Sequence, residues 1–254
     1  MVAFVFVACD DYNKLMKSTD YDYKLQRADE YYDTKVYARA AELYEELIPI
    51  FRGTDKSERI YYRYAWSEFK IGDAILSQYH FKNFARQFPN SEHTEECYYM
   101  NAFCYYLNSP NYSLDQTYSR NAIKEFQSFI DLYPQSSKVD TCNAMIDILR
   151  AKIERKEYEI IKQYHKIYDF KAAAVAAGNF IKEYPLSLYN EEMYWVIIDS
   201  YYSLALNSYP SKKKARIEAA IENYVKFASL YPKSSYLSRA ENIYNHCIRL
   251  KEKL

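Results

Sequence analysis

The sequence is poor in glycine. It has 3 glycines in 254 residues, whereas glycine makes up roughly 7% of an average protein. Glycine supplies the positive-φ backbone of hairpin turns and phosphate-binding loops, and Gly53, Gly72 and Gly178 lie far apart. Neither GxGxxG nor GxxxxGK[ST] can therefore be written. This excludes those two nucleotide-binding motifs and makes a β-sandwich or barrel improbable.

The sequence also lacks an excess of either charge. It has 34 Lys and Arg against 34 Asp and Glu, a net charge of zero. A general nucleic-acid binder needs surplus positive charge against phosphate, so that class is disfavoured. The longest basic run, Lys212-Lys213-Lys214, is expected to be a solvated loop. With 27% charged and 49% hydrophobic residues, the chain has enough apolar material for a core and is not membrane-spanning throughout.

The histidines and cysteines do not form a recognisable catalytic or metal-binding pattern. No HExxH and no CxxC occurs, so we predict a non-enzymatic protein without metal or cofactor. The histidines are expected at the surface or in helix packing, and the four cysteines after Cys9 are expected to be buried free thiols. Those residues are His80, His93, His165 and His246, and Cys97, Cys104, Cys142 and Cys247.

One pattern, F-x-x-x-[FY]-P-x-S, recurs along the chain. Four copies start at Phe84, Phe129, Phe180 and Phe227, and a degenerate copy starts at Leu47. A small residue lies seven positions earlier, and in most copies an aromatic residue lies three positions earlier, which makes one stripe along a helix. The proline ends that helix, and the serine after it is expected to cap the next one.

Each copy follows another helical segment, so each unit is predicted to be a helix hairpin. This is the tetratricopeptide (TPR) pattern, and it predicts an all-α superhelical stack of about five hairpins with a C-terminal capping helix over 236–254. The copies are spaced 37, 45, 51 and 47 residues apart, more than the usual 34. We expect the excess in a loop at 108–118, a lengthened helix within 139–168 and a loop at 207–214. Gly178, inside a helix, is expected to mark a tight packing site.

The N-terminus resembles the end of a bacterial lipoprotein signal. Residues 1–8 are apolar and end in a small residue before Cys9. We predict a truncated signal peptide at 1–8, acylation of Cys9 and a lipidated polar tether at 9–19. Two or three acyl chains would hold the domain at a membrane, since one chain binds only reversibly. The alternative is an ordinary cysteine in a frayed hydrophobic terminus.

Aromatic residues are concentrated in the first helices of the first three repeats. First helices line the concave groove of such stacks, and aromatic side chains are favoured anchors for peptides. The alternative is that these rings pack between hairpins. The predicted groove residues are Tyr32, Tyr62, Trp66, Phe69, Tyr99, Phe103 and Tyr106.

Three features together resemble the BamD family of outer-membrane β-barrel assembly lipoproteins. They are Cys9 with its tether, the first repeat with its exit Phe51-Arg-Gly-Thr54, and the stretch from Ser109 to Thr117 followed by Ala122–Ile130 and Tyr133-Pro. The resemblance implies a non-enzymatic protein anchored by lipid at the periplasmic face of the outer membrane. It implies binding of a BamA-like barrel protein through its POTRA domains, and of unfolded barrel proteins with aromatic C-terminal signals. Repeats 1–3 (20–137) would bind clients, and repeats 4–5 with the capping helix (138–254) would dock the complex.

Two other functions stay open from the sequence. One is a TPR lipoprotein scaffold for peptidoglycan or division machinery. The other is a glycan-capturing lipoprotein of the SusD type, whose members are much longer than this chain.

Overall fold

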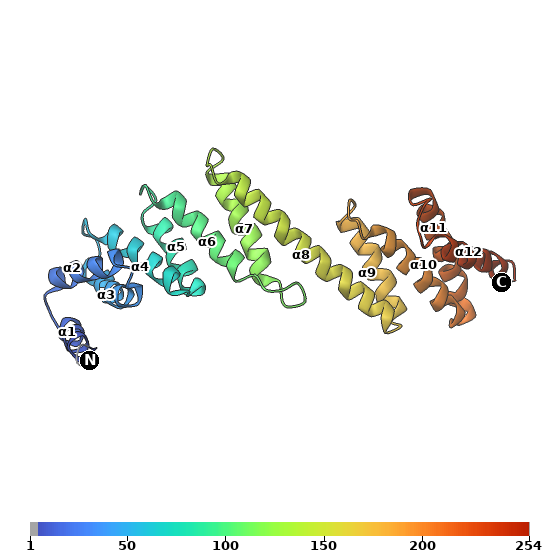
Figure 1. Cartoon of the computed structure of the whole chain (residues 1–254). Coiled ribbons are helices and arrows are strands. Elements are labelled where there is room, and N and C mark those ends of the chain that lie inside the picture. Colours follow the sequence, from blue (N-terminus) through green and yellow to red (C-terminus); the bar gives the residue numbers. More distant parts are fainter. Residues whose placement is uncertain (1–4, 254) are drawn as a thin grey trace. The chain divides into compact units, whose positions relative to one another are not determined.

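The structure is a computed structural model that describes residues 5–253, with side chains from residue 11 onward. Within that range the chain forms twelve α-helices and no strand (Figure 1). The predicted all-α fold class is therefore confirmed, and consecutive helices pack as in a TPR-like stack. The helices are α1 Val5–Met16, α2 Tyr21–Asp33, α3 Tyr37–Ile50, α4 Ser57–Ile71, α5 Ala74–Gln87, α6 Thr94–Leu107, α7 Thr117–Leu132, α8 Val139–Lys166, α9 Phe170–Glu183, α10 Asn190–Leu206, α11 Pro210–Leu230 and α12 Leu237–Lys251.

The chain divides into two compact units, one up to Arg150 and one from Ala151. The division falls inside α8, whereas the sequence analysis drew its boundary at 137/138, just before that helix. The N-terminal part of α8 packs in the first unit through Cys142, Ile146 and Leu149. Its C-terminal part packs in the second unit. One helix thus belongs to the cores of both units.

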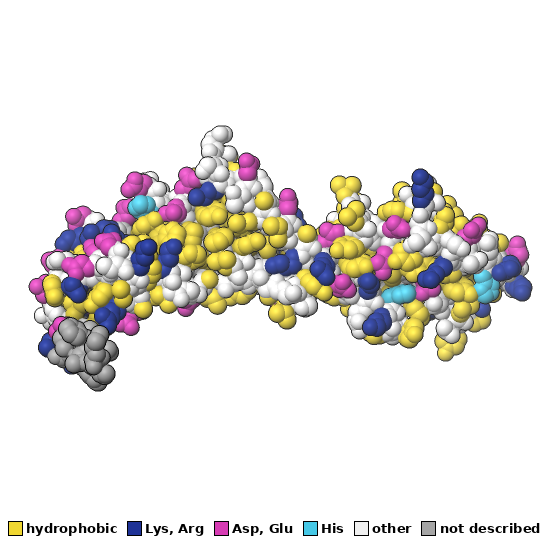
Figure 2. Space-filling model, viewed as in Figure 1, with side chains coloured by type: hydrophobic (Ala, Val, Ile, Leu, Met, Phe, Trp, Pro, Cys, Tyr) yellow, Lys and Arg dark blue, Asp and Glu magenta, His cyan; other side chains and the backbone are white. Residues whose placement is uncertain are grey.

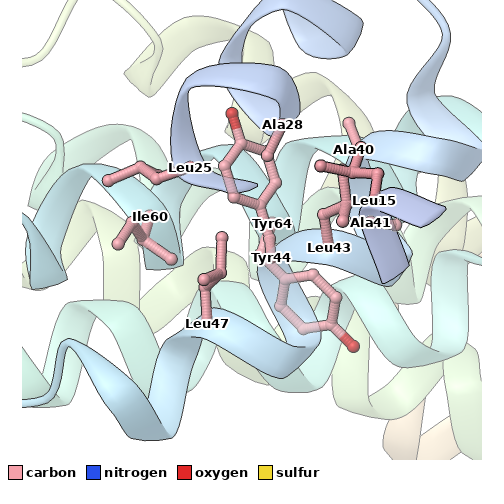
Figure 3. Close-up of a cluster of buried hydrophobic side chains, with 10 residues drawn as sticks. All are labelled: Leu15, Leu25, Ala28, Ala40, Ala41, Leu43, Tyr44, Leu47, Ile60 and Tyr64. Carbon is pink, nitrogen blue, oxygen red and sulfur yellow. The ribbon is translucent and has the colours of Figure 1, made fainter. Parts of the chain in front are cut away.

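The predicted stripe of each second helix forms the core. In α5 the stripe consists of Ser77, Phe81 and Phe84, and all three are fully buried. Figure 3 shows the first-repeat equivalent, in which Ala40, Tyr44 and Leu47 lie among residues of α2 and α4. The second helix of a hairpin is therefore wedged between its own first helix and that of the next hairpin. The stripe of α11 is buried less completely than the others, because its aromatic residue Tyr224 is only half-buried.

The proline-serine turns end helices as predicted, but the serine is not the helix cap. The residue before each proline is the C-cap, for example Phe88 of α5 and Tyr184 of α9. Ser91 accepts a hydrogen bond on Oγ from the backbone N–H of His93 (3.1 Å), and His93 is the N-cap of α6. The serine therefore closes the turn two residues before the N-cap of the helix. Its hydroxyl donates to Glu58 of α4 (2.6 Å) and so joins consecutive repeats.

Two of the three predicted sources of extra length are confirmed. Residues 108–116 form a loop, and α8 is 28 residues long. The predicted loop at 207–214 is wrong, since α11 begins at Pro210 and includes Lys212-Lys213-Lys214. Proline is compatible with the first helical position because its N–H would have no partner there and its φ already suits a helix.

The end of α1 packs against the first repeat. Leu15 is buried in the core of that repeat. The ammonium of Lys24, which is 1% exposed, donates to the Met16 carbonyl (2.7 Å) and to Glu46 (2.6 Å). Much of the predicted tether at 9–19 is therefore helical. The side chain of Cys9 and residues 1–4 lie outside the described residues, so the signal and acylation remain predictions.

The glycines have different roles from each other. Gly72 closes α4 with φ +101°, a left-handed backbone that glycine adopts without strain. The same turn follows α2 and α8, where Lys35 (φ 62°) and Tyr168 (φ 63°) take the left-handed position. Gly178 was predicted to be a tight packing site, and this is wrong. A Cβ added there would meet no atom within 4 Å.

This contrast generates a stability prediction. Gly72→Ala should lower the free energy of unfolding by about 1 kcal/mol, because alanine is strained at positive φ. Gly178→Ala should raise it by about 0.5–1 kcal/mol, because alanine favours a helix interior. Neither added methyl meets a neighbour, so urea unfolding of the two variants compares backbone effects alone. A change of the same sign in both variants would contradict this explanation.

Candidate functional site

Six of the seven predicted groove residues form a connected row of aromatic rings in the first unit. We call this row the aromatic ladder: Tyr62, Trp66, Phe69, Tyr99, Phe103 and Tyr106. Within α4, Trp66 contacts the rings of Tyr62 (6.4 Å between centroids) and Phe69 (5.6 Å). Phe69 meets Phe103 of α6 at 6.4 Å, and Phe103 contacts Tyr99 and Tyr106.

Helix periodicity explains the row. In each helix three rings follow at intervals of four and three residues, which places them on one face. The α4 and α6 sets match ring for ring at an offset of 37 residues, so they occupy equivalent positions in neighbouring hairpins. Figure 2 shows hydrophobic side chains gathered over α4 and α6.

Each ladder ring has one side against the core and keeps some exposure. Trp66 packs edge-on against buried Phe81 (5.4 Å), and Tyr106 against buried Phe126 (6.3 Å). All six rings are half-buried. Each ring therefore supports the hairpin junction and also presents surface.

Tyr62 and Tyr99 also make contacts between hairpins. Tyr62 stacks on His93 at the start of the next hairpin, with centroids 4.0 Å apart. Tyr99 lies 4.9 Å from the ammonium of Lys138, just before α8. In the second unit Tyr158 stacks in the same way on Tyr189 (4.0 Å). Stacking of a first-helix tyrosine on a ring at the start of the next hairpin thus occurs in both units.

Positive side chains lie over the aromatic rings, a feature that the sequence analysis missed. Lys70 lies 5.2 Å from the Trp66 ring and 6.0 Å from Phe69. The guanidinium of Arg63 lies 4.7 Å from the Tyr32 ring. Such cation–π contacts hold the charge beside an apolar surface. The first unit therefore holds cationic groups beside partly exposed aromatic rings.

Tyr32, the seventh predicted residue, is not part of the ladder. It lines a polar pocket of about 520 Å³, and the ladder residue Tyr62 lines the same pocket. Arg63 pairs there with Asp29 (3.2 Å) and Asp33 (3.1 Å). Tyr62 donates to Glu96 (2.5 Å), and burial together with the Glu96 charge raises the pKa of Tyr62. This pocket is an ordered network of paired charges. Its lining residues are Tyr32, Asp55, Glu58, Arg59, Tyr62, Arg63, Glu92 and His93.

A 34-residue spacing of polar partners could have revealed this network. Asp29 and Arg63 are 34 residues apart, as are Tyr62 and Glu96. In the second unit, Tyr158 with Glu192 repeats this separation. The TPR period of 34 therefore persists in first-helix contacts, although the second-helix motif is spaced more widely.

The histidines and cysteines take packing roles. Burial lowers the pKa of His80 to about 4, and His165 meets Asp199 at 2.7 Å. Cys97, Cys104, Cys142 and Cys247 are buried and unpaired, as predicted. Burial raises the pKa of Cys142 and of Cys247 to about 11, which keeps these thiols protonated. Within the part of the chain that the structure describes, no cluster of His, Cys, Asp or Glu could hold a metal ion.

The insertion at 108–116 is an ordered loop around a buried glutamine. The Gln116 amide donates to the carbonyls of Asn111 (2.8 Å) and Leu114 (3.0 Å). Its carbonyl accepts from Ser119 (2.6 Å), whose hydroxyl also meets that of Ser109. The Asp-Gln-Thr sequence therefore has a structural purpose, because the glutamine closes the loop against α7.

Comparison with known proteins places this architecture among bacterial envelope proteins. The sequence matches the YfiO family, described as outer membrane lipoprotein, over residues 23–215 and again over 151–254. It is also similar to the outer membrane protein assembly factor BamD of Pasteurella multocida (strain Pm70). The two are 23% identical over 193 residues, which cover 72% of this chain and 74% of that protein. Among the described residues, no helix has the length and apolar character needed to cross a membrane.

Proposed function

Because the chain belongs to the YfiO family of outer membrane lipoproteins, as its BamD resemblance predicted, we propose that it is a non-enzymatic component of an outer-membrane β-barrel assembly complex. In this role it binds a BamA-like barrel protein and unfolded barrel clients. The observation that carries the proposal is the family match over most of the chain, together with the aromatic ladder in the first unit. Lipid on Cys9 would hold it at the periplasmic face of the outer membrane.

The aromatic ladder is suited to an unfolded client. An extended segment rich in aromatic side chains can lay its rings between those of Trp66, Phe69 and Phe103, where ring-on-ring contacts add to apolar burial. These anchors are already ordered by the core beneath them, so binding orders few side chains of the protein. Lys70, held over Trp66 and Phe69, lies where it can meet a client carboxylate.

The second unit is the proposed docking half. All seven predicted groove aromatics lie in the first unit, so the client surface and the complex-binding surface are assigned to different units. A scaffold for peptidoglycan or division machinery would share the fold and the anchor. The two functions differ in the partner that is recovered from the cell envelope.

The ladder can be tested by peptide binding. Trp66→Ala with Phe103→Ala should weaken binding of a peptide that ends in an aromatic residue by about tenfold or more, because two ordered aromatic anchors are lost. Tyr79→Ala is the matched control, since Tyr79 is 59% exposed on a second helix. Fluorescence anisotropy gives the affinity and circular dichroism the helix content. Equal affinity of the double variant and the control would remove the ladder from the proposal.

The anchor can be tested by fractionation. Cys9→Ala should leave a folded protein that no longer sediments with membranes, because the proposed attachment is through acyl chains on Cys9. Cys247→Ala, which alters a buried thiol, controls for loss of a cysteine. Membrane retention of the Cys9→Ala protein would show that acylation is not the sole tether.

The proposed complex is tested by purification from membranes under mild detergent. The wild-type chain should recover a BamA-like barrel protein, identified by mass spectrometry. Recovery of a peptidoglycan or division complex with no barrel protein would reject the assembly function and favour the scaffold.

A further inference from the structure

Two turns of the second unit expose apolar side chains at one border of that unit. The α8–α9 turn carries Ile167 (56% exposed) and Tyr168 (77%), and the α10–α11 turn carries Leu206 (46%) and Tyr209 (82%). Figure 1 draws both turns at the lower border of this unit, and Figure 2 shows hydrophobic side chains there. Lysines flank the apolar residues in both turns, so we call residues 166–171 and 206–214 the basic edge.

The basic edge is positively charged although the whole chain has no net charge. Asp169 is the only acidic residue in the two segments. Its carboxylate accepts a hydrogen bond from the Ala172 N–H (3.1 Å), because Asp169 is the N-cap of α9. The lysines of the edge are Lys166, Lys171, Lys212, Lys213 and Lys214.

The helices packed beside the edge do not offset this charge. Asp199 of α10 meets His165 (2.7 Å), and Glu218 of α11 pairs with Lys251 of α12 (3.1 Å). The last turn of α12 is itself basic, and its Leu250 packs on the core beneath the α10–α11 turn. The other charged residues of these segments are Arg216, Arg249, Glu252 and Lys253.

Both turns place side chains where the fold itself disfavours them. Tyr168 has φ 63°, a left-handed backbone that strains a bulky residue. Gly72 takes the equivalent position after α4 without strain. Lys212 and Lys213 lie in the first turn of α11, which has no acidic residue, and the positive end of a helix dipole disfavours cations. Exposed side chains that cost the fold stability point to a role outside the fold.

We propose that the basic edge lies against a bilayer surface that carries anionic headgroups. Tyrosine is favoured at the interface between membrane and water, so Tyr168 and Tyr209 enter the headgroup region together with Ile167 and Leu206. The lysines meet lipid phosphates around them. The membership of the chain in a family of outer membrane lipoproteins supplies the membrane. This inference goes beyond the proposed function, since it requires no barrel protein.

A bilayer fits this surface better than an acidic protein does. The apolar side chains are at the tips of two separate turns, and a bilayer deforms around projecting tips, whereas a folded protein would need two matching cavities. Surface charges are screened by salt, so the contact is weak by itself. The edge therefore orients a chain that is anchored elsewhere and does not replace acyl chains during fractionation.

Vesicle binding tests the proposal directly. The full chain with Cys9→Ala is used throughout, so that no acyl chain contributes to binding. At low salt it should sediment with vesicles of phosphatidylcholine mixed with phosphatidylglycerol, and about tenfold or more weakly with phosphatidylcholine alone. Added salt should release it from the mixed vesicles. Equal binding to both vesicles, or binding to neither, would overturn the proposal.

The lysines are tested by the triple variant Lys212→Gln, Lys213→Gln and Lys214→Gln. It should bind the mixed vesicles about tenfold or more weakly, because three cations near the surface are lost. The matched control removes the same charge from three exposed lysines outside the edge in the same unit, and it should bind like the parent chain. Equal losses in both variants would show general charge attraction and reject the edge. The control variant is Lys182→Gln, Lys226→Gln and Lys233→Gln.

The tyrosines are tested by Tyr168→Gly with Tyr209→Ser. Vesicle binding should fall about threefold or more, because two interfacial aromatic rings are lost. The melting temperature should not fall, since glycine suits the backbone at position 168. Leu186→Ser with Leu188→Ser is the control, because these leucines are 94% and 96% exposed in a different turn. Unchanged binding by the tyrosine variant, or an equal loss in the control, would overturn the proposal.

The outcomes are independent of the proposed assembly function. Vesicle binding by the basic edge with no barrel protein recovered from membranes would leave this inference standing and reject the assembly function. Recovery of the barrel protein with no vesicle binding would do the reverse.

Discussion

The structure depends on one packing constraint, namely that no hairpin can bury its second helix alone. The small residue, the aromatic residue and the leading phenylalanine of each motif lie on one helical stripe. That stripe is covered only when the first helix of the next hairpin lies against it, as Phe81 and Phe84 show beside Cys97 and Met100. Stability in such a stack comes from neighbouring interfaces, so each hairpin depends on the next one for burial of its second helix.

A second set of contacts sets the register between first helices. Polar and aromatic partners 34 residues apart, such as Tyr62 with Glu96 and Tyr158 with Glu192, join one hairpin to the next. The extra residues of the longer repeats extend α8 and α11 or form the loop closed by Gln116. First-helix partners on either side of such an extension lie further apart along the chain, as with Tyr202 of α10 and His246 of α12, which are 44 residues apart.

Function in this fold resides on whatever the packing leaves exposed. The aromatic ladder is the outer side of the hairpin junctions of the first unit, so residues that stabilise the stack also present surface. Leu186 and Leu188 are different, because at 94% and 96% exposure they contribute nothing to packing.

The sequence alone determined the helical class, the stripe, the proline stops, the buried thiols and the family, because these follow from local periodicity and short motifs. It could not determine that the serines bridge repeats, that α11 starts at Pro210, or that Gly178 has open space around it. Those depend on which atoms of distant segments meet. The cations over Trp66 and Tyr32, and the exposure of Leu186 and Leu188, were likewise decided only by tertiary structure. Periodicity assigns a residue to a helix face, but the neighbouring hairpin decides how much of that face is covered.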